Sequence, residues 1–104
     1  MKTHEEYMEL ALEEARKAEE IDEVPVGCVI VCDGEIISCG HNLKEQLNQA
    51  YAHAEMIAIQ KAAEIKGNWC LNDCDLYVTL EPCMMCTGII NLSRIRTVYY
   101  GTQD

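Results

Sequence analysis

The ten residues "AYAHAEMIAI" (50–59) decide how the rest of the sequence is interpreted. Their small and apolar composition is typical of a buried helix, yet His53 and Glu55 interrupt it two positions apart. Residues two apart on a helix point about 200° away from each other, so these side chains cannot share a side face. They can converge only at the end of the helix. The stretch therefore predicts a helix that runs to about Lys66 and carries reactive groups in its first turn.

The segment "EPCMMC" (81–86) provides a second reactive pair further along the chain. Proline is favoured in the first turn of a helix, and cysteines three positions apart lie on one face of that turn. Cys83 and Cys86 can therefore reach one ion, and a helix N-terminus favours the thiolate form that binds zinc. A C-x-x-C pair alone is a weak signal, because redox dithiols and ordinary core cysteines show the same spacing.

His53 and the cysteine pair together predict a catalytic metal centre. His53, Cys83 and Cys86 would together give zinc three protein ligands, the number typical of a catalytic site with water in the fourth position. Glu55 is then free to accept a proton from that water, whereas a structural zinc site has no use for a spare carboxylate. H-x-E followed by P-C-x-x-C is the known signature of zinc nucleobase deaminases.

The remaining sequence predicts an alternation of helices and strands. Thr3 and Glu6 form a capping-box pattern, and Asp33-Gly34 suits a two-residue type I′ hairpin loop. Strands that are joined by helices favour parallel pairing, so we expect an α/β mixed sheet with an antiparallel hairpin and parallel strands. The expected elements are a helix at 3–20, strands at 24–32 and 35–40, a helix from 50 to about 66, a strand at 75–80, a helix at 83–92 and a strand at 96–101.

Length and hydropathy set limits on the kind of protein. The 104 residues suffice for one compact domain and are too few for two, so we expect a single domain over residues 1–104. The longest apolar run is "CVIVC" (28–32), far short of the roughly 20 residues that a membrane span needs. The first residues lack the basic-then-apolar order of a signal peptide. We therefore expect a soluble, cytoplasmic protein with no membrane partner.

The cysteine count and the net charge restrict the chemistry further. Seven cysteines are an odd number and favour thiols or metal ligands over disulfides. Cys70 and Cys74 could form a four-cysteine structural site with Cys83 and Cys86, but the gap between the pairs is shorter than the roughly 15–20 residues usual in such modules. The net charge of -10, with only eight Lys and Arg, counts against broad nonspecific binding to nucleic acid.

Further segments beyond the zinc signature are also distinctive. They are "EVPVG" (23–27), "HN" (41–42), "AHAEMIAI" (52–59), "NWCL" (68–71), "DLYVTLEPCMMCTGII" (75–90), "SRI" (93–95) and "YGTQD" (100–104). In these segments the sequence resembles the cytidine deaminase-like superfamily over essentially all its length, and within it is most similar to the bacterial tRNA-specific adenosine deaminases. The resemblance implies a three-layer fold with helices on both faces of the sheet, one Zn²⁺ per subunit and a homodimer.

The same resemblance implies a reaction: hydrolytic deamination of adenosine to inosine at the wobble position of a tRNA anticodon stem-loop. His53, Cys83 and Cys86 match the zinc ligands, and Glu55 matches the residue that shuttles protons. The implied substrate contacts are Asn42 on the flipped base, the backbone of Ala54 beside it, the backbone of Glu81 and Pro82 in the pocket wall, and Asp104 near the nucleotide 5′ to the target.

The sequence also departs from that family. Ala50-Tyr51 stands where the family has Pro-Thr or Pro-Ser, and the family continues beyond Asp104 with a further helix, strand and helix, so we expect a C-terminally shortened domain. Two alternatives remain. The chain could deaminate a free base or nucleotide such as cytosine, guanine or a riboflavin precursor, or it could be a noncatalytic, zinc-stabilised partner subunit.

Overall fold

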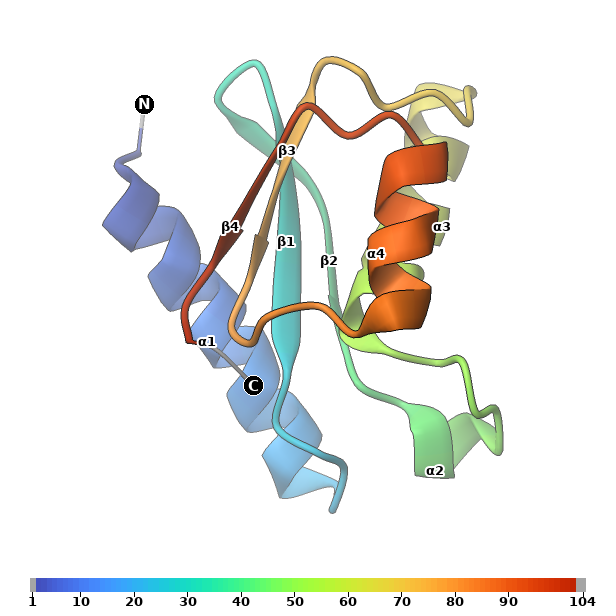
Figure 1. Ribbon diagram of the computed structural model, residues 1–104. Coiled ribbons are helices and arrows are strands. Elements are labelled where there is room, and N and C mark those ends of the chain that lie inside the picture. Colours follow the sequence, from blue (N-terminus) through green and yellow to red (C-terminus); the bar gives the residue numbers. More distant parts are fainter. Residues whose placement is uncertain (1, 103–104) are drawn as a thin grey trace.

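A computed structural model describes residues 2–102 and shows a four-stranded sheet between two layers of helices (Figure 1). Helix α1 covers one face of the sheet, and α3 and α4 cover the other. The expected three-layer α/β fold is confirmed. The elements are α1 (His4–Glu20), β1 (Gly27–Cys32), β2 (Glu35–His41), α2 (Lys44–Leu47), α3 (Ala54–Lys66), β3 (Cys74–Val78), α4 (Met84–Leu92) and β4 (Thr97–Tyr100). Within residues 2–102, no helix is both long and apolar enough to cross a membrane.

The sheet is mixed, in the order β2-β1-β3-β4. Asp33 and Gly34 have φ values of 51° and 81°, so both adopt the positive φ that a type I′ hairpin turn requires, and the β1–β2 hairpin is confirmed. The α4 crossover makes β3 and β4 parallel neighbours, as expected. The α3 crossover does not bring β2 and β3 into contact. Strand β1 lies between them and pairs antiparallel with both.

Strand β1 is buried on both faces. Val29 and Val31 pack with α1, whereas Cys28 and Ile30 belong to the core under α3 and α4. Successive side chains of a strand point to opposite faces, so a central strand between two helix layers needs a continuous apolar run and not an alternating one. This is why "CVIVC" carries no polar residue.

Helix α3 begins later than expected, at Ala54. The residues before it form a turn, in which the Ala52 N–H donates to the Gln49 carbonyl at 3.1 Å and the His53 N–H donates to the Tyr51 carbonyl at 2.8 Å. The prediction of a helix from residue 50 is therefore wrong, because these backbone groups are already paired in a turn. His53 becomes the N-cap, at the mouth of the helix.

A short helix, α2, lies between β2 and α3, where no helix or strand was expected. The buried carboxylate of Glu23 accepts hydrogen bonds from the backbone N–H groups of Glu45 at 3.1 Å and Gln46 at 2.7 Å. These N–H groups have no partner within the helix, so the carboxylate stabilises its first turn. Glu23 thereby anchors residues 42–47 beside the beginning of β1 and the end of β2.

Gly40 allows α3 to approach the sheet closely. A Cβ atom at this position would lie 2.7 Å from the Ala54 carbonyl oxygen and 3.0 Å from the Ala58 backbone nitrogen. Both obstacles are backbone atoms, which cannot move aside without shifting the helix. A glycine here fixes the position of the first turn of α3.

A buried carboxylate connects α1 to the end of β2. Glu14 accepts a hydrogen bond from Lys17 at 2.6 Å and lies 3.0 Å from Nδ1 of His41. Burial alone would raise the pKa of Glu14, but the hydrogen bonds to His41 and Lys17 outweigh it and hold this pKa below its ordinary value. The charged form of Glu14 therefore stabilises the contact between α1 and β2.

Replacing Gly40 with alanine is expected to destabilise the fold by about 1–3 kcal/mol, because the added methyl group overlaps backbone atoms of α3. Gln60→Ala is the control, because this side chain is exposed on α3 and a surface substitution there should change stability by less than about 0.5 kcal/mol. Urea denaturation of both variants checks this. Equal stabilities would contradict the close-approach argument.

Glu14→Gln is expected to lower the free energy of unfolding at neutral pH by about 1–3 kcal/mol. Because the folded-state pKa of Glu14 is depressed, its contribution is present above the ordinary value of 4.5 and is lost as pH falls through the folded pKa. The difference between wild type and variant should therefore shrink in acid. Denaturation across a pH series measures it, with Glu13→Gln, an exposed neighbour, as control. A difference independent of pH would refute the assignment.

Candidate metal centre and active site

The N-termini of α3 and α4 meet at one end of the sheet and bring the predicted ligands together. His53 is the N-cap of α3 and Cys83 is the N-cap of α4, both with extended backbone. Neither side chain makes a hydrogen bond to its own helix, so both are free to point off the helix ends. Cys86 lies in the first turn of α4 and is buried. The expected convergence of two helix mouths is what the structure shows.

The three side chains have the geometry of a metal site. Nδ1 of His53 lies 3.6 Å from Sγ of Cys83 and 3.6 Å from Sγ of Cys86, and all three ligand atoms lie within 4.8 Å of one another. Zn–S and Zn–N bonds of about 2.3 and 2.0–2.1 Å in a tetrahedron imply an N···S separation of about 3.6 Å. The donor set therefore fits zinc without rearrangement. Cys83 is exposed, so one side of the site is open.

The electrostatics of the cluster favour a bound cation. Burial raises the pKa of Cys86 well above its usual range, and the neighbouring charges of Glu55 and Cys83 raise it further. A thiolate at this position therefore needs a positive partner. A divalent ion among the three ligands would supply that charge and hold both sulfurs as thiolates.

Glu55 lies beside the cluster without belonging to it. It is in the first turn of α3, its side chain is buried, and it lines the same cavity as His53 and Cys83. Burial raises the pKa of Glu55, while the hydrogen bond from its own backbone N–H and the proximity of His53 partly offset the effect. A carboxyl group with a raised pKa is suited to accept and return a proton near neutral pH.

A cavity of about 230 Å³ opens onto the cluster. This volume is below the roughly 300 Å³ at which sites for drug-sized molecules begin, so it suits one small chemical group. Its wall is mainly apolar on the side of β1, and Lys44 of α2 stands on its rim. The lining residues are Val24, Val26, Asn42, Lys44, His53, Ala54, Glu55, Leu80, Glu81 and Cys83.

Asn42 lines this cavity and has an unpaired side-chain oxygen. Its side chain is buried, and Oδ1 is the buried side-chain oxygen or nitrogen atom without a hydrogen-bond partner among residues 2–102. Leaving such an atom unpaired costs about 1–3 kcal/mol, so a polar ligand in the cavity would recover that energy. The position supports the expected role of Asn42 in holding a substrate.

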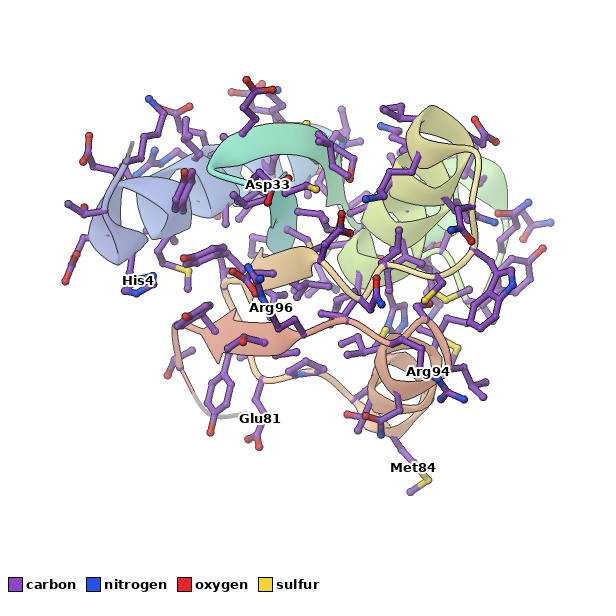
Figure 2. All side chains as sticks on the ribbon, turned by 90° about the horizontal axis from the view of Figure 1, so that it is seen from above. His4, Asp33, Glu81, Met84, Arg94 and Arg96 are labelled. Carbon is purple, nitrogen blue, oxygen red and sulfur yellow. The ribbon has the colours of Figure 1, made fainter. Side chains whose placement is uncertain are left out.

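The other residues that were expected to contact the substrate differ in burial and position. Ala54 is buried and lines the cavity. The side chain of Glu81 is exposed and directed outward (Figure 2), while its N–H donates to the Thr102 carbonyl at 2.8 Å, so only its backbone can shape the wall. Pro82 is partly buried between Glu81 and the metal ligands. Asp104 lies outside the described residues.

Several cavity residues were not expected from the sequence. Lys44 and Val24 reach the cavity because Glu23 anchors the start of α2 beside β1. The only local signal is that Val24 adjoins Glu23 and that Lys44 follows Asn42 by two positions. The alternative four-cysteine site does not form in the described residues, because Cys74 lies with Cys32 and Asp73 instead.

Comparisons with known proteins identify relatives of the chain. It is 54% identical over 98 residues to a tRNA-specific adenosine deaminase from Streptococcus pyogenes. The aligned residues cover 94% of this chain and 62% of that protein. It is 51% identical over 98 residues to a tRNA-specific adenosine deaminase from Bacillus subtilis. The aligned residues cover 94% of this chain and 61% of that protein. The chain thus spans about three fifths of the length of these relatives.

Solved structures share the fold. One, from studies of A-to-I editing by tRNA:A34 deaminases at the wobble position of transfer RNA, superposes with a TM-score of 0.93 at 52% identity, over 95% of this chain and 76% of that one. A guanine deaminase from Bacillus subtilis superposes with a TM-score of 0.95 at 39% identity, over 98% of this chain and 66% of that one.

The family match spans the metal-ligand cluster, the buried glutamate and the residues that line the cavity. The model of the cytidine and deoxycytidylate deaminase zinc-binding region matches residues 1–102. The match includes both helix mouths and the whole of the described sheet. The chain belongs to the zinc-binding cytidine and deoxycytidylate deaminase family.

Proposed function

We propose that this chain carries the catalytic site of a zinc-dependent deaminase that converts adenosine to inosine at the wobble position of a tRNA anticodon. The observation that carries the proposal is a three-ligand cluster with a separate buried Glu55 in one cavity. Relatives at 54% and 51% identity, named tRNA-specific adenosine deaminases, support adenosine in tRNA as the substrate.

The chain's residues divide the work of the reaction. His53, Cys83 and Cys86 would hold the zinc ion, which when bound lowers the pKa of a water molecule and so supplies the nucleophile. Glu55 would accept one proton from that water and pass it to the purine ring, then accept the proton of the added hydroxyl group and pass it to the departing amine, so that water and adenosine give inosine and ammonia. Asn42 hydrogen-bonds the base through its unpaired Oδ1, and the apolar wall excludes other water from the reacting carbon.

Deamination of a free purine is the second candidate. The cavity of about 230 Å³ is large enough for one base only, and the guanine deaminase fold superposes closely on this chain. The net charge of -10 also suits a small substrate better than a polyanion. The higher identity to the tRNA deaminases favours the tRNA substrate, so we place guanine second.

Exposed apolar side chains on α4 support a homodimer. Met84, Met85 and Leu92 expose 91%, 40% and 66% of their surface, and Figure 2 shows Met84 directed away from the body of the molecule. We propose that a second copy of the chain covers this face. An enzyme acting on tRNA also fits the cytoplasm as its location.

Glu55→Gln is expected to reduce turnover by about 10²–10⁴-fold, because general acid–base catalysis contributes that much, while the zinc ion at His53, Cys83 and Cys86 is retained. Inosine formation in an anticodon stem-loop carrying adenine, and ammonia release from free guanine, measure activity on the two candidate substrates. Glu64→Gln, an exposed position on the same helix, is the control.

The two activity assays and the zinc content distinguish a tRNA deaminase, a guanine deaminase and a noncatalytic subunit. Turnover of the stem-loop alone supports the tRNA assignment, and turnover of guanine alone overturns it in favour of the second candidate. Zinc binding without turnover of either substrate indicates a noncatalytic subunit. If Glu55→Gln kept full turnover, the proton-shuttle role would be wrong.

The homodimer predicts a particle of twice the 11.7 kDa chain mass in sedimentation equilibrium. Replacing Met84 and Leu92 with serine should weaken association, because both side chains lie on the proposed interface. Ile65→Ser, another exposed apolar position but on α3, is the control. A monomer at micromolar concentration would contradict the dimer.

A further inference from the structure

The end of the sheet opposite the metal centre carries a second group of metal-ligating side chains. Cys32 is the last residue of β1 and Cys74 is the first residue of β3, and the two are direct partners across the antiparallel pair. Asp73 precedes Cys74. One ligand atom from each of the three residues lies within 4.8 Å of the other two.

The three ligand atoms converge at the boundary of the core. Cys74 is fully buried, and Cys32 is partly buried and packs against the same core cluster. The Asp73 carboxylate lies 3.3 Å from Sγ of Cys32 and 3.4 Å from Sγ of Cys74. One oxygen and two sulfurs thus surround a common point that solvent can reach from the side of Asp73, whose side chain is 42% exposed.

A positive charge already occupies this point. Nζ of Lys66 lies 2.6 and 2.5 Å from the two carboxylate oxygens of Asp73 and 3.6 Å from Sγ of Cys32. The hydrogen bond from Lys66 holds the pKa of Asp73 well below its usual range. The cluster is therefore arranged to hold a cation, and its two thiols favour one softer than an ammonium group.

We propose that Cys32, Asp73 and Cys74 bind a second divalent cation of the thiophilic class, zinc or cadmium, with Lys66 as counter-charge outside the ligand shell. Thiolate donors select such ions over magnesium or calcium. Two S–H protons leave as two metal–sulfur bonds form, and an Asp73 oxygen exchanges the ammonium for the ion. The formal charge of the site is zero before binding, when Asp73 and Lys66 are charged and both thiols are neutral, and zero after binding, when two thiolates, Asp73, Lys66 and the divalent ion are counted.

The second site is independent of the first. The two sites share no ligand and lie at opposite ends of α3, whose 13 residues span about 20 Å. The proposal does not rest on the deaminase activity, and its test uses no substrate.

Native mass spectrometry of the full chain, in reductant and at micromolar free zinc, tests the stoichiometry. We expect two zinc ions per wild-type chain and one in Cys32→Ser. Cys39→Ser, a partly buried thiol on the neighbouring strand β2, is the matched control and should keep two. One ion in the wild type, or two in Cys32→Ser, overturns the site.

The Lys66→Met variant tests the second site while it keeps both thiols in place. Removing the competing ammonium should tighten binding of the second ion by about fivefold, the scale of an exposed ion pair. Cadmium titration, followed by thiolate charge-transfer absorbance, measures the affinity. Circular dichroism confirms that each variant is folded. If Lys66→Met lost the second ion while folded, the lysine would be part of the site and the proposed ligand set would be wrong.

Discussion

The structure depends on one constraint: the two helices on the same face of the sheet follow strands that point the same way, so both begin at the same end of the sheet. Helix α3 follows β2 and helix α4 follows β3, and these two strands point the same way on either side of β1. Each helix therefore starts where its strand ends. His53 and Cys83, as the N-caps, are brought together by topology before any metal is considered. Gly40 then sets how closely α3 approaches.

This placement explains the unusual electrostatics of the site. A strongly acidic chain keeps two acidic groups, Glu55 and Cys86, in a buried position where the pKa of each is raised. Without a cation, burial favours their neutral forms. The N-termini of the two helices supply positive potential at this point, and a bound ion would add to it.

The sequence was informative where chemistry fixes the spacing between residues. The metal ligands and Glu55 could be predicted because three ligands and one free carboxylate satisfy a zinc centre in only a few ways. The rim of the cavity could not, because the path of residues 42–47 depends on Glu23, whose carboxylate caps α2 from about twenty residues earlier. Helix propensity is a local property, so it gives no signal for a capping residue that lies so far away in the sequence. The central place of β1 was missed for a similar reason, since pairing partners depend on the whole sheet.

The joining of two helix ends also affects how the molecule unfolds. His53 and Cys83 are 30 residues apart, and an ion held by both closes that length of chain into a loop that includes α3 and β3. Unfolding opens this loop and releases the ion, so resistance to unfolding grows with the logarithm of free ion concentration. Stability against unfolding is thereby linked to metal supply, and a scarcity of zinc would empty the site and weaken the fold together.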